Sequence, residues 1–550
     1  MDQSSYLRYL PPVLWRDRDM PVGETAGLRL GEWLRIVEKV LTGIDDGVLL
    51  QHGDHVHPSI SDVIAGTDRL LDPWKAPADF LPWLASWVGL DLPTLRDQPL
   101  WDEYRRRRAT AGIASVYRQR GLKDGLLAHL ALHNLGPSRP RVAIDDGSRV
   151  LVTTPRADAL APVSAMVSQG PVLRGQTVFS EGLIRPRCIA RSSSGDFFVG
   201  DFGLPTAVSL PLRPRVWQLT PAGAYRFAEA PPKPRPVAPD TAFNQVIAVA
   251  VRPASGGQPE RLYVLDVRGG LAAVPAPFDG STASSVTSLV SGANTFDPVA
   301  MAVDVNGNLL VLDRGDGSGT PNPPKIITVA LSPLAVTRRP LTTVLQPLSL
   351  LVRRDGTLVI GDGREQEDLG PGKLTGNLVV VDRHDPAAWT ETLLLDADNP
   401  LVAPTAIAED GDGGLYVLDV GIKPFFQLDQ DAFVRAVCEP AAVYRVDPGP
   451  PPRVLRVTEA GRMVSPTGMV ADGGRLVICD PGQPESPSVT PIWPRLRPFR
   501  FDVVVHFRLD GLPEEQGERS RVETQALATI ESVIEDNRPA HTEWAPITAI

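Results

Sequence analysis

The sequence is poor in cysteine and contains no long apolar run. Its 550 residues include three cysteines, Cys188, Cys438 and Cys479, which lie far apart and form no CxxC pair. A disulfide framework or a zinc-ribbon site is therefore not expected, and a reducing cytoplasm suits this composition. No stretch of about 18 consecutive apolar residues is present, so we expect no membrane-spanning helix. The first residues carry no basic segment followed by an apolar run, so we expect no signal peptide.

Excess positive charge is also missing. The formal net charge is -10 at pH 7, and contact with nucleic-acid phosphates requires a basic face, so we expect no nucleic-acid partner. The run Arg105–Arg108 falls in a predicted helix, where four consecutive side chains fan around the axis, and we interpret it as a solvated or partner-facing surface. No nucleophile elbow, phosphate-binding loop or HExxH motif is present. We therefore predict no enzyme, no cofactor and no catalytic residue.

Amphipathic helices dominate the first part of the chain. Apolar residues recur there at intervals of three and four, which predicts helices over residues 28–50, 78–88, 99–120 and 122–133. Tryptophans at helical spacing usually pack in a core, so we interpret Trp33, Trp87 and Trp101 as core residues. The first part of the chain is thus predicted to be a small helical domain.

The segment from residue 183 to residue 490 repeats one pattern six times. The template is a proline, an apolar run, a polar turn with glycine, a second apolar run, then aspartate and glycine; the copy that begins at Phe243 is weaker. Two apolar runs joined by a tight turn such as Asn306-Gly307 predict a β-hairpin. The 48 glycines and 55 prolines of the chain suit such turns. The aspartates that end the second run are Asp201, Asp266, Asp313, Asp362, Asp419 and Asp480.

The repeats predict a six-bladed β-propeller. Successive repeat aspartates lie about 47 to 65 residues apart, enough for four short strands. A hairpin cannot bury its face alone, and radial stacking of the sheets removes most exposed edges. Third strands are predicted over residues 215–220, 325–331, 377–382 and 442–447. The sixth copy lacks one, so we expect a strand from its N-terminal side, around residues 172–179, to close the ring. The repeats resemble the NHL family of propellers.

Two groups of residues invite a metal or catalytic interpretation. The segment HGDHVH carries His52, Asp54, His55 and His57, but no fourth ligand or acid–base partner is apparent, so we interpret it as a polar loop and predict no metal site. The repeat aspartates could act as in lactonase-like propellers, which hold a central divalent ion. One aspartate at the same position of every copy, however, is what a structural role predicts, with each carboxylate accepting backbone N–H groups. Whether calcium occupies the channel stays open.

After Pro498 the pattern changes again. The alternation in FRFDVVVHFRL predicts a strand over residues 499–509, and a helical stripe follows over residues 520–537 until Pro539 in the segment PAHT. Together with YLPPVLWRD, LDPWKAPADFLPWLASWVGLDL and YRQRGLKDGLLAHLAL near the start, this ending resembles the phage tail protein I family. These are baseplate wedge proteins of contractile tails and of related injection systems. In that family the strand, helix and PAHT ending follows much sooner.

The resemblance covers residues 5–180 and 498–545, so we predict that a propeller is inserted into a tail protein. The fold class would be multidomain α+β: a small helical tail-protein domain, split by an all-β six-bladed propeller. The expected domains are residues 1–182, the propeller at 183–490, and the second part of the tail domain at 491–550. A closed propeller brings its own ends together, which suits insertion into a loop. The family-motif positions, expected to serve folding and contacts, are Trp83, Trp87, Tyr117, Arg120, Gly121, Pro539, His541 and Thr542.

The resemblance implies a structural baseplate subunit, made and assembled in the cytoplasm. Its partners would be other wedge proteins, the spike or hub, and the sheath of a contractile tail. The propeller would be a peripheral module that binds a protein or another cell-surface or intracellular ligand. Two alternatives stay open: a propeller protein that binds a receptor or glycan, and a lactonase-like or lyase-like enzyme. The sequence does not decide between a phage and a domesticated injection system.

Overall fold

The chain forms two compact units, residues 1–119 and residues 120–550. The architecture comes from a computed structural model, which describes residues 4–14, 26–44, 51–52, 55–92, 94–95, 98–99, 101–133, 140–146, 149–156, 159–167, 172–174, 177–179, 182–203, 214–226, 228–229, 233–238, 243–254, 257–276, 278, 286–290, 297–315, 322–363, 376–385, 388–396, 398–427, 432–437, 439–459, 462–482, 500–507, 512–513, 515–544 and 548–549. Within these residues, no helix has the length and apolar character needed to cross a membrane.

The first unit is built from short helices. Its elements are η1 (Ser5–Tyr9), η2 (Pro12–Leu14), α1 (Ala26–Thr42), β1 (Gln51–His52), β2 (His55–Val56), α2 (Ile60–Ala65), α3 (Thr67–Leu70), η3 (Ala78–Phe80), α4 (Leu81–Trp87), β3 (Thr94–Leu95), β4 (Gln98–Pro99) and α5 (Glu103–Tyr117). Side-chain caps start several helices here: for example, Ser59 and Asp62 form a capping box on α2, and the Asp102 side chain accepts from the Arg105 N–H at 2.8 Å at the start of α5. Ala76, Leu81 and Leu84 form a small buried cluster around η3 and α4, with Phe80 packed against it.

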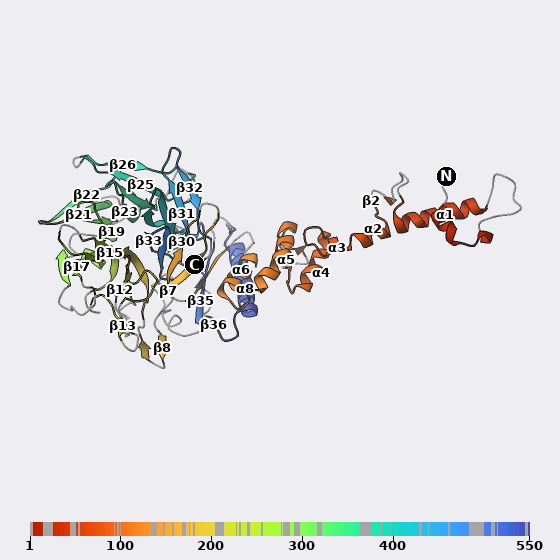
Figure 1. The fold of residues 1–550 in the computed structure, drawn as a ribbon, viewed down its shortest axis with the longest axis horizontal. Coiled ribbons are helices and arrows are strands. Elements are labelled where there is room, and N and C mark those ends of the chain that lie inside the picture. Colours follow the sequence, from red (N-terminus) through yellow and green to blue (C-terminus); the bar gives the residue numbers. More distant parts are fainter. Residues whose placement is uncertain are drawn as a thin grey trace. The chain divides into compact units, whose positions relative to one another are not determined.

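The second unit contains a small module made from two distant segments. We call residues 120–146 and 500–549 the host module. Its elements are α6 (Lys123–His133), β5 (Arg141–Asp145), β35 (Arg500–His506), α8 (Gln516–Asn537), β36 (Glu543–Trp544) and β37 (Thr548–Ala549). β5 pairs antiparallel with β35, while β36 and β37 pair parallel with it. The two helices lie beside this sheet (Figure 1). They pack on it through one buried cluster, whose members include Leu126, Leu130, Val142, Ile144, Val503, Val505, Ile530 and Ile534.

Six larger antiparallel sheets account for most of the other described residues of the second unit. Their strands are β10 (Pro186–Arg191), β11 (Phe197–Asp201), β12 (Arg215–Leu219); β15 (Val246–Arg252), β16 (Arg261–Asp266), β17 (Leu271–Pro275), β18 (Thr287–Val290); β19 (Pro298–Val303), β20 (Leu309–Asp313), β21 (Lys325–Leu331), β22 (Leu334–Pro340); β23 (Pro347–Val352), β24 (Leu358–Asp362), β25 (Asn377–Asp382), β26 (Thr390–Leu393); β27 (Pro404–Glu409), β28 (Leu415–Asp419), β31 (Ala442–Asp447), β32 (Arg453–Arg456); and β33 (Gly468–Asp472), β34 (Arg475–Asp480), β6 (Arg149–Thr153), β7 (Val163–Val167).

The six sheets close into a ring, as predicted. The first strands contact one another in the order β10, β15, β19, β23, β27 and β33, and β33 contacts β10 again. Apolar clusters fill the space between neighbouring sheets; one joins Tyr263 and Leu265 of β16 to Leu309 and Val311 of β20. The predicted third strands coincide with β12, β21, β25 and β31. The ring is therefore a six-bladed propeller.

The strands that complete the sixth blade are not those expected. β34 pairs with β6, and β6 pairs with β7, so the blade is completed from the N-terminal side, but by residues 149–153 and 163–167 rather than by residues 172–179. The latter form a separate hairpin of β8 (Val172–Arg174) and β9 (Thr177–Phe179). The propeller strands thus begin near residue 149, well before the expected boundary at 183. Two further hairpins are β13 (Ala228–Glu229) with β14 (Lys233–Pro234), and β29 (Ile422–Gln427) with β30 (Ala432–Val437).

Two antiparallel strand pairs, β5 with β35 and β6 with β34, lie where the host module meets the propeller. β5 ends at Asp145, whose register partner is Asp502, and β6 begins at Arg149, whose partner is Asp480. Only three residues, 146–148, separate β5 from β6. The outgoing and returning chains are therefore neighbours on both sides of the junction, which is why an insertion here need not disturb the host sheet.

Candidate functional site

An exposed apolar face runs along α1 of the first unit. Trp33 and Ile36 are 61% and 63% exposed, and Val40 lies on the same side, one turn further on. Trp33 was predicted to be a core residue, and this prediction is wrong. The opposite side of α1 holds Glu38, which is 7% exposed and accepts hydrogen bonds from the Ser4 hydroxyl at 2.6 Å and the Ser5 N–H at 2.9 Å. These hydrogen bonds hold the pKa of Glu38 below its ordinary value.

A second exposed surface is an aromatic row on η3 and α4. The ring centroids of Phe80 and Trp83 lie 4.3 Å apart, and those of Trp83 and Trp87 lie 4.2 Å apart. Trp83 and Trp87 are nevertheless 43% and 63% exposed. The expectation of a core position for Trp87 is therefore also wrong. Among the tryptophans of this unit whose side chains are described, Trp101 alone is buried. Aromatic side chains gathered on a surface typically mark a protein contact.

The motif residues around the end of α5 make backbone contacts. The Tyr117 hydroxyl donates to the Gly89 carbonyl at 2.8 Å, which ties the end of α5 to the turn after α4. Gly121 adopts φ of +84°, a conformation that other residues rarely take. Arg120 donates to the Asp536 carbonyl in the last turn of α8 at 2.9 Å, within the host module.

The PAHT segment forms the turn between α8 and β36. The Thr542 N–H and hydroxyl both donate to the Pro539 carbonyl, at 2.9 and 2.7 Å. The indole N–H of Trp544 reaches back to Glu535 at 2.6 Å, and Arg538 donates to the Thr542 carbonyl. His541 is exposed in this turn. These contacts direct the chain from the helix into the sheet beside β35.

The repeat aspartates lie at the ends of the second strands of the blades and bind backbone. Asp201 accepts from the N–H groups of Ile184, Arg185 and Gly203 at 2.7 to 2.9 Å. The other five likewise accept N–H groups from residues just before their own first strand. Five of the six are almost completely buried, and Asp266 is less so. Each carboxylate therefore fastens one hairpin to the segment that enters the blade.

The channel of the propeller is a cavity of about 440 Å³ lined mainly by the first strands of the blades. Apolar side chains such as Ile247 and Met301 share this lining with Arg185, Arg187 and Arg314. Within the described lining no carboxylate or imidazole is present, and no group of three potential metal ligands occurs elsewhere in the described residues. A lining of this chemistry suits anionic groups better than a divalent cation.

A buried arginine fastens the host module to the propeller. Arg141 of β5 is 7% exposed and donates to the carbonyls of Val420 and Val464 at 2.8 and 3.0 Å. Burial lowers the pKa of Arg141 to about 10 and raises that of nearby Asp419 to about 6. Arg149 extends the junction through ion pairs with Asp146 at 3.1 Å and Asp480 at 3.4 Å. We did not predict this junction from the sequence, because its charged residues come from segments about 270 to 340 positions apart and no local motif marks them.

The histidine-rich segment and the family-motif residues are spread over both units of the chain. In HGDHVH, the backbone forms the hairpin of β1 and β2, while Asp54 and the side chains of His52 and His55 lie outside the described residues. Trp83, Trp87 and Tyr117 belong to the first unit, and Arg120, Gly121, Pro539, His541 and Thr542 belong to the host module.

Comparison with solved structures gives likenesses to propeller proteins. A chain of the nidogen–laminin complex is 11% identical with a TM-score of 0.36, covering 59% of this chain and 98% of its own. The gluconolactonase XC5397 of Xanthomonas campestris is 14% identical with a TM-score of 0.35, covering 55% and 85%. A virginiamycin B lyase of Staphylococcus aureus is 11% identical with a TM-score of 0.34, covering 62% and 99%. At these TM-scores, the propeller assignment rests on the strand pairings above.

Comparison by sequence places the helical region in a family. A search of curated proteins gave no match. The family model described as phage tail protein (Tail_P2_I) matches residues 49–137, which include α2 to α6. The match confirms the predicted resemblance for this segment. The chain thus carries a domain of the Tail_P2_I phage tail protein family together with a six-bladed β-propeller.

Proposed function

We propose that the chain is a structural subunit of the baseplate of a contractile phage tail or of a related injection system. The observation that carries this proposal is the exposed apolar surface of the first unit. Trp33, Ile36, Trp83 and Trp87 all lie on helices of that unit and are more than two-fifths exposed. Exposed apolar surface of this kind, on α1 and separately on α4, is costly on a free soluble protein and typical of a subunit interface.

The spacing on α1 indicates the kind of contact. Leu30, Trp33, Val37 and Val40 follow one another at intervals of three, four and three. This spacing places apolar side chains along one seam, as in helices that pack against another helix. Neighbouring baseplate wedge proteins would supply that partner, with the spike or hub and the sheath nearby. The role is structural rather than catalytic, and the propeller serves as a peripheral binding module.

Assembly with charged variants tests this role. A glutamate in the seam, Trp33→Glu or Val40→Glu, would bury a charge against the partner, so we expect at least a tenfold loss of the chain from purified tails. The matched control is Leu455→Glu, because Leu455 is 57% exposed on β32 of the propeller and lies outside the proposed interface. Incorporation of both seam variants at the level of the control would contradict the proposal, provided that all three are soluble and folded by circular dichroism.

A further inference from the structure

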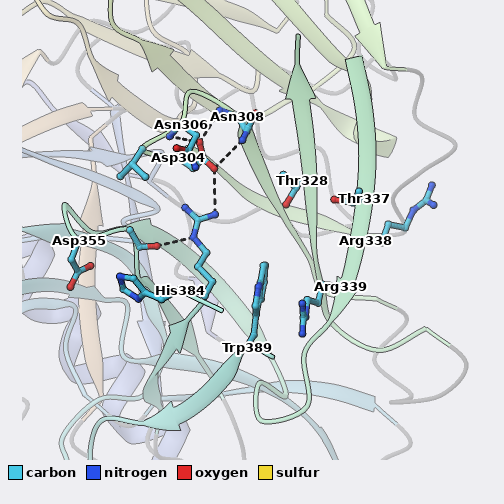
Figure 2. Close-up of a pocket in the computed structure, with 13 residues that line it drawn as sticks. Asp304, Asn306, Asn308, Thr328, Thr337, Arg338, Arg339, Asp355, His384 and Trp389 are labelled. Atoms are coloured by element: carbon cyan, nitrogen blue, oxygen red, sulfur yellow. Dashed lines mark hydrogen bonds and ion pairs between the residues drawn. The ribbon is translucent and has the colours of Figure 1, made fainter. Parts of the chain in front are cut away.

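The propeller carries a pocket between two adjacent blades, at the end of the ring away from the host module. The turn from β19 to β20 and the turn from β23 to β24 form its edge, whereas Arg141 of the host module contacts the opposite end, beside Val420 and Val464. The cavity has a volume of about 570 Å³ (Figure 2), within the usual range for a small-molecule site. Its lining consists of Asp304, Val305, Asn306, Asn308, Thr328, Thr337, Arg338, Arg339, Asp355, Gly356, Arg383, His384 and Trp389.

A fixed ion pair forms one wall of this pocket. Arg383 lies 3.4 Å from the Asp304 carboxylate, whose side chain is 3% exposed, and donates from Nε to the Gly356 carbonyl at 2.7 Å. Asp304 also accepts from the N–H groups of Asn306 and Asn308, at 2.9 and 2.8 Å. These contacts hold the Arg383 guanidinium in place before any ligand arrives, so little conformational entropy is lost on binding.

An aromatic ring and basic groups form the other wall. The Arg339 guanidinium lies 4.8 Å from the centroid of the Trp389 ring. Figure 2 shows Trp389 between Arg339 on one side and His384 on the other, while Arg338 points away from the ring. Asp382 hydrogen-bonds to His384 at 2.6 Å and raises the pKa of its imidazole, which favours the cation. Basic side chains therefore outnumber acidic ones here, in a chain whose net charge is -10.

We propose that this pocket binds an acidic saccharide, a sugar chain whose units carry carboxylates. A sugar ring offers an apolar face that can lie against the indole of Trp389. The guanidinium groups of Arg339 and Arg383 suit a carboxylate, because charge-assisted and paired N–H donors bind it strongly. Asn306, Thr328 and Thr337 supply amide and hydroxyl partners for the sugar hydroxyls. The inference specifies the ligand class for the peripheral binding role proposed above, and it does not depend on assembly into tails.

Titration calorimetry with the purified full chain tests the assignment. The probes are a hexamer of galacturonic acid and a neutral glucose hexamer. We expect the acidic hexamer to bind and the neutral one to bind at least tenfold more weakly, with the difference shrinking as salt is raised. Arg339→Gln and Trp389→Ala should each weaken binding of the acidic hexamer by about tenfold or more. The matched control is Arg456→Gln, on the edge strand β32 of another blade, which should leave binding unchanged.

Three results would overturn the assignment: no binding of the acidic hexamer, equal binding of the neutral one, or unaltered binding by Arg339→Gln. Trp389→Ala removes a ring that packs against a core cluster, so this variant could fail to fold. In that case the Arg339→Gln variant alone tests the assignment. The calorimetry needs no tail particle. A negative result would therefore overturn the saccharide assignment without bearing on the proposed baseplate role.

Discussion

The buried aspartates at the strand ends are the residues on which each blade most depends. Asp313 is fully buried and accepts from the N–H groups of Asp297 and Gly315 at 3.1 and 2.8 Å. Asp313→Ala removes the acceptor of the buried Gly315 N–H and of the half-buried Asp297 N–H, so we expect the free energy of unfolding to fall by about 2 to 4 kcal/mol. The measurement is urea denaturation of the full chain at pH 7, with the exposed Asp398→Ala as control. Equal stability of the two variants would contradict a structural role for the repeat aspartates.

Two stacked histidines on α6 make the stability of the chain depend on pH. The rings of His129 and His133 lie 5.2 Å apart and nearly parallel, and burial lowers the pKa of both, that of His133 to about 4 from its ordinary value of 6.5. The unfolded chain therefore binds these protons more strongly, so stability falls as the pH drops from about 6.5 towards 4.

Replacing one of these histidines should reduce that loss of stability. We expect His133→Phe, which keeps an aromatic ring beside His129, to lose less stability than the unaltered chain between pH 7 and pH 4.5, by roughly 1 to 2 kcal/mol. The readout is the free energy of unfolding at the two pH values, followed by circular dichroism. His541→Phe serves as the control, because His541 is exposed in the PAHT turn. An identical pH dependence in the His133 variant and the unaltered chain would contradict this account.

At the scale of elements, the strand β6 completes the last blade. Leu151 is 2% exposed, pairs with Ile478 of β34, and belongs to the same apolar cluster as Leu418 and Leu476. We expect Leu151→Ala to destabilise the propeller by about 2 to 5 kcal/mol, since it leaves a cavity in a packed core. Leu334→Ala on β22 is the control, because Leu334 is 54% exposed and should change stability by less than about 0.5 kcal/mol. If Leu151→Ala were as mild as the control, β6 would not close the ring.

Local pattern predicted most of the elements but not their long-range partners. Periodicity marked α4, α5, α6 and α8 closely, and glycine turns marked the hairpins of the blades. The strand that closes the ring was wrongly predicted at residues 172–179. The strand that does close it, β6, lies outside the repeats and pairs with β34 about 330 positions away, so no local pattern identifies it. Periodicity also does not distinguish an apolar stripe that packs in the chain's own core from one that packs against another subunit. Both positions favour the same apolar residues, so the exposure of Trp33 could not be predicted.

At the scale of the whole molecule, the host module is one sheet interrupted by a propeller. Asp145 of β5 and Asp502 of β35 are register partners in an antiparallel pair, so a short turn between them would make an ordinary hairpin. We expect a chain in which a glycine-containing turn replaces residues 147–499 to keep the α6 and α8 packing and to unfold cooperatively. Arg141→Ser would accompany the deletion, because Arg141 loses its carbonyl partners Val420 and Val464. Loss of cooperative unfolding by circular dichroism would contradict the description of the propeller as an insertion.

The proposed baseplate role requires that the chain be a part of a tail particle. Density-gradient fractionation of a native lysate, with the chain detected by mass spectrometry, tests this association. We expect the chain to sediment with sheath and tube proteins in a particle far larger than its own 59.3 kDa. Sedimentation as a free monomer, in a lysate that contains intact tails, would contradict it.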